Sequence, residues 1–115
     1  MTLNEYQKAA MATLNPALDK KDVLINGVMG LCGESGEVID VVKKHLAQGH
    51  DLDTEKIAKE LGDVAWYIAE TAYAIGYDLE TICQMNIDKL NRRYPQGFST
   101  AASVRREDTD NSANK

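Results

Sequence analysis

Residues 54–76 read Thr-Glu-Lys-Ile-Ala-Lys-Glu-Leu-Gly-Asp-Val-Ala-Trp-Tyr-Ile-Ala-Glu-Thr-Ala-Tyr-Ala-Ile-Gly. Apolar side chains recur here at every third or fourth position, which is the pattern of a helix with one buried face. Asp53 or Thr54 can cap the start of this helix, and Gly76 can end it. The rest of the chain shows no strand-like alternation, so we expect an all-α fold.

The preceding segment, from Val23 to Gln48, has the same helical spacing and ends at Gly49. Its first half carries a glycine at every third position: Gly27, Gly30, Gly33 and Gly36. Each glycine weakens a helix by up to about 1 kcal/mol, so this helix is expected to bend or to begin late. The missing side chains would also let another backbone or a ligand come close.

Two shorter helices are expected on either side of this pair. Thr2 and Glu5 have the form of a capping box, and Pro16 ends the first pattern. Asp78 can cap a fourth helix that must stop near Pro95. From Ser99 onward the chain is polar, which indicates a flexible or loosely docked tail. The sequence thus predicts one domain over residues 1–98, built as a four-helix bundle, and a tail over residues 99–115.

Length and charge exclude several classes of protein. The chain has 115 residues, and 13 Lys and Arg against 18 Asp and Glu give a net charge of −5, which argues against a nucleic-acid polymer as partner. No apolar run is long enough to span a membrane, and the N-terminus does not resemble a signal peptide. Two cysteines without a CxxC pair fit reduced thiols. A cytoplasmic protein is expected.

Two pairs of acids have the same spacing: Glu34-Ser-Gly-Glu37 and Glu60-Leu-Gly-Asp63. Such pairs also arise by chance on solvated helix faces, but these two border apolar positions. Side chains three apart in a helix are neighbours, so two facing helices would gather four carboxylates, an arrangement that requires protons or cations. Oxygen ligands alone select Mg²⁺ or Mn²⁺. A di-iron centre is not expected, because no Glu-x-x-His occurs.

Polar and aromatic neighbours extend the candidate site. By helical geometry Lys44 falls within the acid stripe, and Tyr67 falls between Glu60 and Asp63. Trp66 could cover a nucleobase, although core packing is at least as good an interpretation. On the fourth helix Asn86, Lys89 and Arg93 share one stripe that suits phosphate and sugar oxygens, or that forms a solvated basic edge.

This pattern resembles the MazG-like, all-α nucleoside triphosphate pyrophosphohydrolases, whose signature is E-x-x-E followed by E-x-x-D on the next helix. The segment from Asn86 to Phe98, which reads Asn-Ile-Asp-Lys-Leu-Asn-Arg-Arg-Tyr-Pro-Gln-Gly-Phe, is also typical. The resemblance covers residues 3–98. It implies Mg²⁺-dependent hydrolysis of nucleoside triphosphates between the α and β phosphates, giving a nucleoside monophosphate and pyrophosphate. It also implies a homodimer, commonly paired into a homotetramer.

The resemblance also implies roles for single residues. The metal ligands would be Glu34, Glu37, Glu60 and Asp63. Glu37 is the candidate to orient or deprotonate the attacking water. Asn86 and Lys89 match an element that contacts the nucleotide, Arg93 and Lys44 are candidates for phosphate, and Gln7 could approach the base. The alternative is a non-catalytic helical module that binds a nucleotide or a protein in the same acidic groove.

Overall fold

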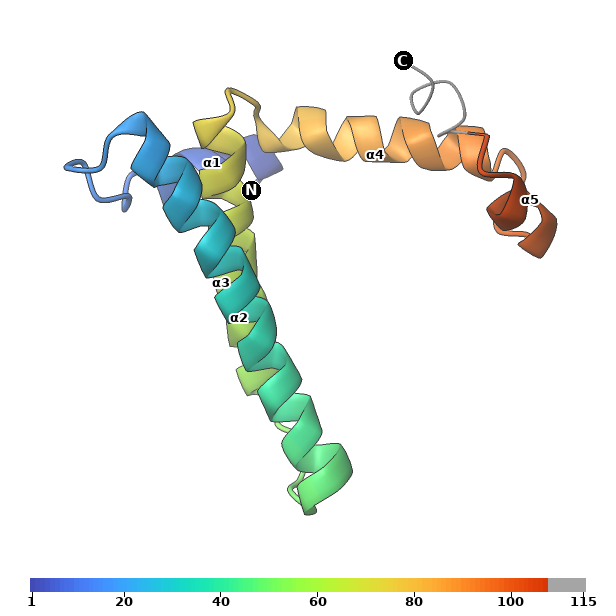
Figure 1. Cartoon of the computed structure of the whole chain (residues 1–115), viewed down its shortest axis with the longest axis horizontal. Helices are drawn as coiled ribbons and strands as arrows, with labels where there is room; N and C mark the ends of the chain where they lie inside the picture. The colour runs from blue at the N-terminus through green and yellow to red at the C-terminus, as the bar shows by residue number, and fades with distance from the viewer. Residues whose placement is uncertain (108–115) are drawn as a thin grey trace. The chain divides into compact units, whose positions relative to one another are not determined.

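The computed structural model describes residues 1–107, and over these residues it is all-α, as predicted. Five helices follow one another: α1 (Leu3–Met11), α2 (Lys20–Gln48), α3 (Thr54–Ala74), α4 (Leu79–Arg93) and α5 (Thr100–Arg105) (Figure 1). The chain divides into two compact units, Met1–Leu79 and a second that begins at Glu80. No helix of the described part is long and apolar enough to cross a membrane.

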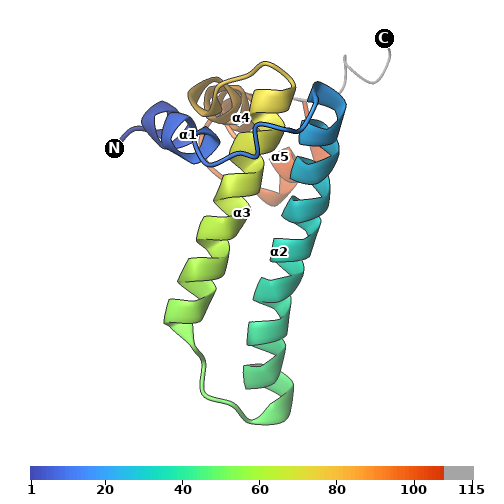
Figure 2. The same ribbon diagram turned by 90° about the vertical axis from the view of Figure 1, so that its left-hand side faces the viewer.

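In the first unit α2 and α3 form a long antiparallel hairpin, and α1 packs against α3 (Figure 2). The predicted helix ends agree with the caps. Thr2 and Glu5 form the capping box, Asp53 accepts a hydrogen bond from the Lys56 amide, and Gly49 ends α2 with a φ of 73°.

The glycines of α2 do not delay the start of the helix, so the expectation of a late start was wrong. Asp19 caps α2, which runs over 29 residues from Lys20. The expected close approach is found at two of the four glycines: a Cβ at Gly27 would meet the Thr71 side chain 2.5 Å away, and one at Gly30 would overlap the Tyr67 ring. A Cβ at Gly33 or Gly36 would meet nothing within 4 Å. Packing against α3 therefore offsets the low helix propensity of Gly27 and Gly30.

The core of the described chain is small and rich in alanine. The buried apolar residues are Ala10, Val23, Val41, Ala69, Ala72, Leu79 and Ala102. Large apolar side chains remain exposed on α2, including Met29 at 68% and Ile39 at 67%. One chain alone therefore covers little of its apolar surface.

The buried Gln7 side chain of α1 forms hydrogen bonds with the backbone at three positions of the first unit. Its Nε2 donates to the carbonyl oxygens of Ala69 and Tyr77 at 3.3 and 3.1 Å, and its Oε1 accepts from the Leu79 amide at 3.0 Å. The side chain is buried, so its amide secures the turn after α3. These bonds occupy both ends of the amide, and an approach of Gln7 to a base stays a prediction.

In the second unit a short helix lies within the segment that was expected to be flexible. The Ser99 side chain caps α5 by accepting a hydrogen bond from the Ala102 amide, and Ala102 is buried. A hydrogen bond with Ser103 lowers the pKa of Tyr94. The rings of Tyr94 and Phe98 lie 5.4 Å apart. A local cap and small apolar contacts thus order residues 100–105, which composition alone did not reveal. The rest of the predicted tail, residues 108–115, lies outside the described residues.

Candidate metal centre

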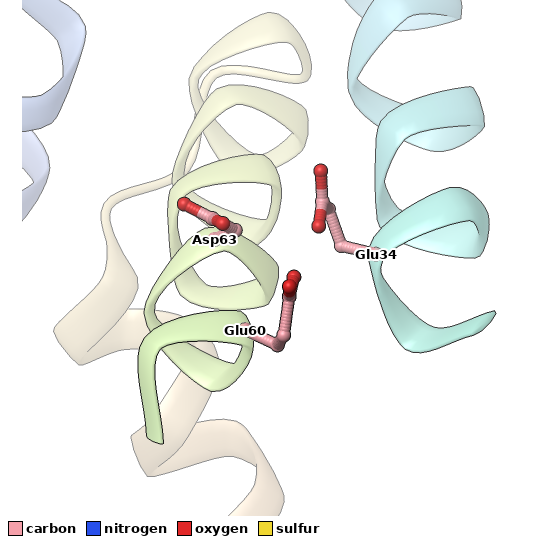
Figure 3. A group of neighbouring side chains, drawn as sticks. All are labelled: Glu34, Glu60 and Asp63. Atoms are coloured by element: carbon pink, nitrogen blue, oxygen red, sulfur yellow. The ribbon is translucent and has the colours of Figure 1, made fainter. Parts of the chain in front are cut away.

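Three of the four predicted acids converge between α2 and α3. Glu34 projects from α2 toward Glu60 and Asp63 of α3 (Figure 3). One carboxylate oxygen from each residue lies within 4.8 Å of the others. We call these residues the acid triad. The helical repeat accounts for Glu60 and Asp63, which are three positions apart on one face, and the hairpin brings Glu34 opposite them.

The electrostatics of the acid triad show a shortage of positive charge. A hydrogen bond with Glu60 raises the pKa of Glu34, and partial burial and the charges of Asp63, Glu60 and Glu37 raise it further. A proton or a cation would relieve this repulsion. Three carboxylates with no His or Cys in the group are a donor set for a hard divalent ion such as Mg²⁺ or Mn²⁺. The residues therefore fit the predicted metal.

Glu37 lies outside the acid triad. It is exposed, and none of its oxygens joins the group that spans 4.8 Å. Its charge nevertheless contributes to the raised pKa of Glu34, so it lies at the edge of the same electrostatic field. The role of Glu37 as a metal ligand or as a base for water remains a prediction.

A pocket of about 330 Å³ adjoins the acid triad. Glu34, Asp63, Trp66 and Tyr67 line it, and the two aromatic rings meet edge to face with their centroids 5.1 Å apart. Trp66 also has the structural role that was the alternative to base binding. Its Nε1 donates to Thr13 Oγ1 at 2.9 Å and to the Ala10 carbonyl at 3.2 Å. The structure shows this structural role, and contact of Trp66 with a base stays a prediction.

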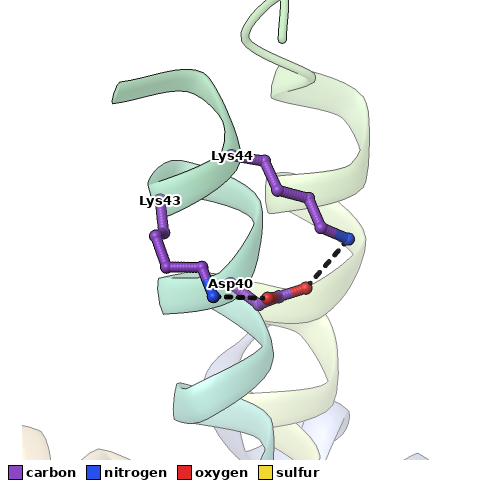
Figure 4. A network of polar contacts seen from close by, with 3 residues as sticks. All are labelled: Asp40, Lys43 and Lys44. Carbon is purple, nitrogen blue, oxygen red and sulfur yellow. Dashed lines mark ion pairs between the residues drawn. The ribbon is translucent and has the colours of Figure 1, made fainter. Parts of the chain in front are cut away.

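Lys44 is held by a neighbouring acid on its own helix. Asp40 accepts from Lys44 at 3.1 Å and from Lys43 at 3.5 Å (Figure 4). The hydrogen bond and charge of Lys44 lower the pKa of Asp40. Lys44 lines a separate pocket of about 310 Å³ together with Val41, His50, Asp51, Asp53 and Lys56. Lys44 is not among the residues that line the pocket beside the acid triad, and its contact with phosphate stays a prediction.

The remaining predicted residues lie on α4, in the second unit. Asn86 is exposed, and Lys89 and Arg93 are half-buried. Arg93 also lies 5.9 Å from the centroid of the Tyr94 ring. The contact of these three residues with a nucleotide remains a prediction from the resemblance.

Three residues of the first unit that bear on the site were missed from the sequence: Tyr6, Asn26 and Glu70. Burial and the charge of Asp63 raise the pKa of Tyr6, which places this residue of α1 in the field of the triad. Glu70 is completely buried and accepts hydrogen bonds from Asn26. Glu70 follows Asp63 by seven residues, a helical repeat that could have indicated a shared face.

Comparisons with known proteins show the family. Residues 26–98 match the family described as the MazG nucleotide pyrophosphohydrolase domain. One relative is the Gene 37 protein of Mycobacterium phage L5, which is 40% identical over 105 residues that cover 84% of this chain and 92% of the relative. No solved structure matches the chain. The family match includes all three residues of the acid triad, and the chain belongs to the MazG nucleotide pyrophosphohydrolase family.

Proposed function

We propose that the protein hydrolyses nucleoside or deoxynucleoside triphosphates between the α and β phosphates, with Mg²⁺ as the resident ion and Mn²⁺ as a substitute. Membership of the MazG family supports a nucleotide pyrophosphohydrolase. The single observation that carries the proposal is the convergence of Glu34, Glu60 and Asp63 within 4.8 Å. Such clustering costs electrostatic energy in a pure scaffold, whereas it suits a site that binds a cation and a phosphate.

The residues would divide the chemistry as follows. The acid triad holds the divalent ion, with Glu37 as a further ligand at its edge; when bound, the ion makes water easier to deprotonate and offsets charge on the phosphoryl group. Glu37 accepts a proton from the attacking water at a carboxylate oxygen. The water oxygen then bonds to the α phosphorus, the bond from that phosphorus to the bridging oxygen breaks, and pyrophosphate leaves with the electron pair.

Substrate binding follows from the pocket beside the acid triad. Trp66 and Tyr67 offer aromatic surface for a base. From the family resemblance alone, we propose Asn86, Lys89, Arg93 and Lys44 as amide and cationic donors for sugar and phosphate oxygens. The substrate class would be standard or damaged triphosphates of the nucleotide pool, which the enzyme would remove in the cytoplasm.

We infer that the protein assembles as a homodimer or as a homotetramer made of two dimers. Exposed apolar residues along α2, among them Leu24, Val28 and Met29, support self-association, because a small alanine-rich core leaves this surface uncovered. Light scattering on the purified protein measures the mass directly. A monomer at micromolar concentration would contradict this proposal.

Pyrophosphate release from a panel of nucleoside triphosphates tests the proposed reaction. The parent is compared with Glu37→Gln and Asp63→Asn in the presence of Mg²⁺. Glu55→Gln is the matched control, since Glu55 is an exposed acid of α3 that pairs only with Lys59 among the contacts described, at 3.2 Å. We expect Glu37→Gln and Asp63→Asn to lose activity. Glu55→Gln should keep the activity of the parent. Equal rates in all four proteins would overturn the proposal.

The same proteins distinguish the non-catalytic alternative. A native-state ligand raises thermal stability by mass action. The enzyme is expected to release pyrophosphate and to be stabilised by Mg²⁺ with a non-hydrolysable nucleotide. Stabilisation of the parent without any hydrolysis would instead support a nucleotide-binding module.

A further inference from the structure

A polar pair, made of the buried Glu70 and the exposed Asn26, joins α2 and α3 away from the acid triad. Glu70 of α3 has no solvent exposure, and both of its carboxylate oxygens accept from Asn26 Nδ2 of α2, at 2.9 and 3.0 Å. A carboxyl group removed from water requires hydrogen-bond partners. Asn26 must therefore stay opposite Glu70.

This pair and the acid triad lie along the same seam between the two helices. Asn26 precedes Glu34 by eight residues, about 12 Å along α2, and Glu70 follows Asp63 by seven, about 10 Å along α3. The Asn26–Glu70 pair and the acid triad are thus two points of contact, or crossings, between α2 and α3. Because the helices are antiparallel, the distance between the two crossings is nearly the same along α2 as along α3. A fixed pairing at one crossing therefore sets which residues meet at the other.

The contacts between the two crossings make the seam intolerant of sliding. The Thr71 side chain occupies the space beside Gly27, and the Tyr67 ring occupies the space beside Gly30. If α2 slid along α3 by three or four residues, Glu70 would face Asp22, Val23, Met29 or Gly30, none of which has a side-chain donor. Every such shift except the one that brings Gly30 and Gly33 into these spaces would also place a larger side chain there. Steric fit and hydrogen bonding thus favour the same register.

We propose that Asn26 and Glu70 are a positioning pair that sets the register of α2 against α3 and so holds Glu34 opposite Glu60 and Asp63. The pair does not touch the cation. It acts through the spacing of the three carboxylates, whose oxygens must lie within a few ångströms of one another to share an ion. This inference rests on the proposed cation site of the acid triad.

Binding of Mn²⁺ to the full chain, measured by titration calorimetry without nucleotide, tests the positioning role. Asn26→Ala removes the donor, and we expect affinity to fall by about tenfold, as for other residues that orient metal ligands. Val23→Ala is the matched control, because Val23 is a buried apolar residue of the same helix. It should lower the unfolding temperature without changing the Mn²⁺ affinity. Parent affinity in Asn26→Ala would overturn the proposal.

A double variant that exchanges the two groups shows whether a loss of Mn²⁺ affinity comes from a changed helix register, from a changed charge or from failure to fold. In the double variant Asn26→Asp with Glu70→Gln, the donor and the acceptor change places and the side chains keep their shapes. We expect this variant to retain Mn²⁺ affinity within about threefold of the parent, since hydrogen bonding across the seam persists. A folded double variant with affinity as low as that of Asn26→Ala would overturn the proposal. If the parent itself does not bind Mn²⁺ saturably, the proposed function fails first, which is a distinct result.

Discussion

Tyr67 of α3 lies with its ring against Gly30 of α2, in the space that a side chain at position 30 would fill. The same ring lines the pocket with Glu34 and Asp63. Glycine at position 30 therefore lets the two helices approach closely, and it leaves room for the Tyr67 ring beside the acid triad.

Alanine substitutions at two glycines of α2 should have opposite effects on stability. Gly33→Ala meets nothing within 4 Å and should stabilise the helix by up to about 1 kcal/mol. Gly30→Ala overlaps the Tyr67 ring and should destabilise the protein by about 1–3 kcal/mol, because the ring must leave its place. Urea unfolding measures both values. Equal stabilisation by the two variants would contradict the packing described here.

The raised pKa of Glu34 predicts how the metal-free protein responds to pH. The folded-state pKa lies above the ordinary value of 4.5, so the folded protein takes up this proton before the unfolded chain does. The contribution of Glu34 to stability therefore rises as the pH falls from neutral through the raised pKa, and it is constant below the unfolded value.

Thermal unfolding in a chelator, at several pH values between neutral and 4.5, checks this sign. Other carboxyl groups titrate over the same range, and the lowered pKa of Asp40 acts in the opposite direction. The comparison is therefore the difference between the parent and Glu34→Gln. We expect Glu34→Gln to be more stable at neutral pH, with an advantage that shrinks on acidification. An advantage that does not depend on pH would exclude Glu34 as the titrating group.

The indole of Trp66 should contribute to stability through the end of α1. Trp66→Phe loses the hydrogen bonds to Thr13 and Ala10 and should cost about 1–3 kcal/mol. Thr13→Val removes this acceptor and also the hydrogen bond that Thr13 Oγ1 donates to the Ala10 carbonyl at 2.6 Å, and it should cost about 1–2 kcal/mol. The two losses should be less than additive in the double variant, because they share the interaction between Trp66 and Thr13. Fully additive losses in urea unfolding would rule out this link.

Lys43 and Lys44 form a matched pair for testing the phosphate role. Both contact Asp40, and both side chains are substantially exposed, so replacing either with Gln should change stability by less than about 1 kcal/mol. If Lys44 binds a phosphate oxygen, Lys44→Gln should raise KM by about tenfold, the value of one charge-assisted hydrogen bond. Lys43→Gln should leave KM unchanged. Equal KM values for the two variants would remove Lys44 from the site.

The local parts of this fold could be predicted from the sequence. The starts of α1 and α3 follow from Thr2 and Asp53 as caps, and the end of α2 follows from Gly49 as a terminator. The start of α2 does not: the helix begins at Lys20, before the predicted Val23. The two acid pairs could also be found, because residues three apart in a helix share a face wherever that helix lies. These features depend only on neighbours within a turn or two of the chain.

Contacts between helices required the tertiary structure. The hairpin brings Glu34 into the acid triad and leaves Glu37 outside it, although both belong to one sequence pair. Gln7 closes the turn after α3, and Asn26 meets Glu70 across 44 residues of sequence. The offset of one helix along another is set by packing and by buried hydrogen bonds, and helical periodicity carries no information about that offset.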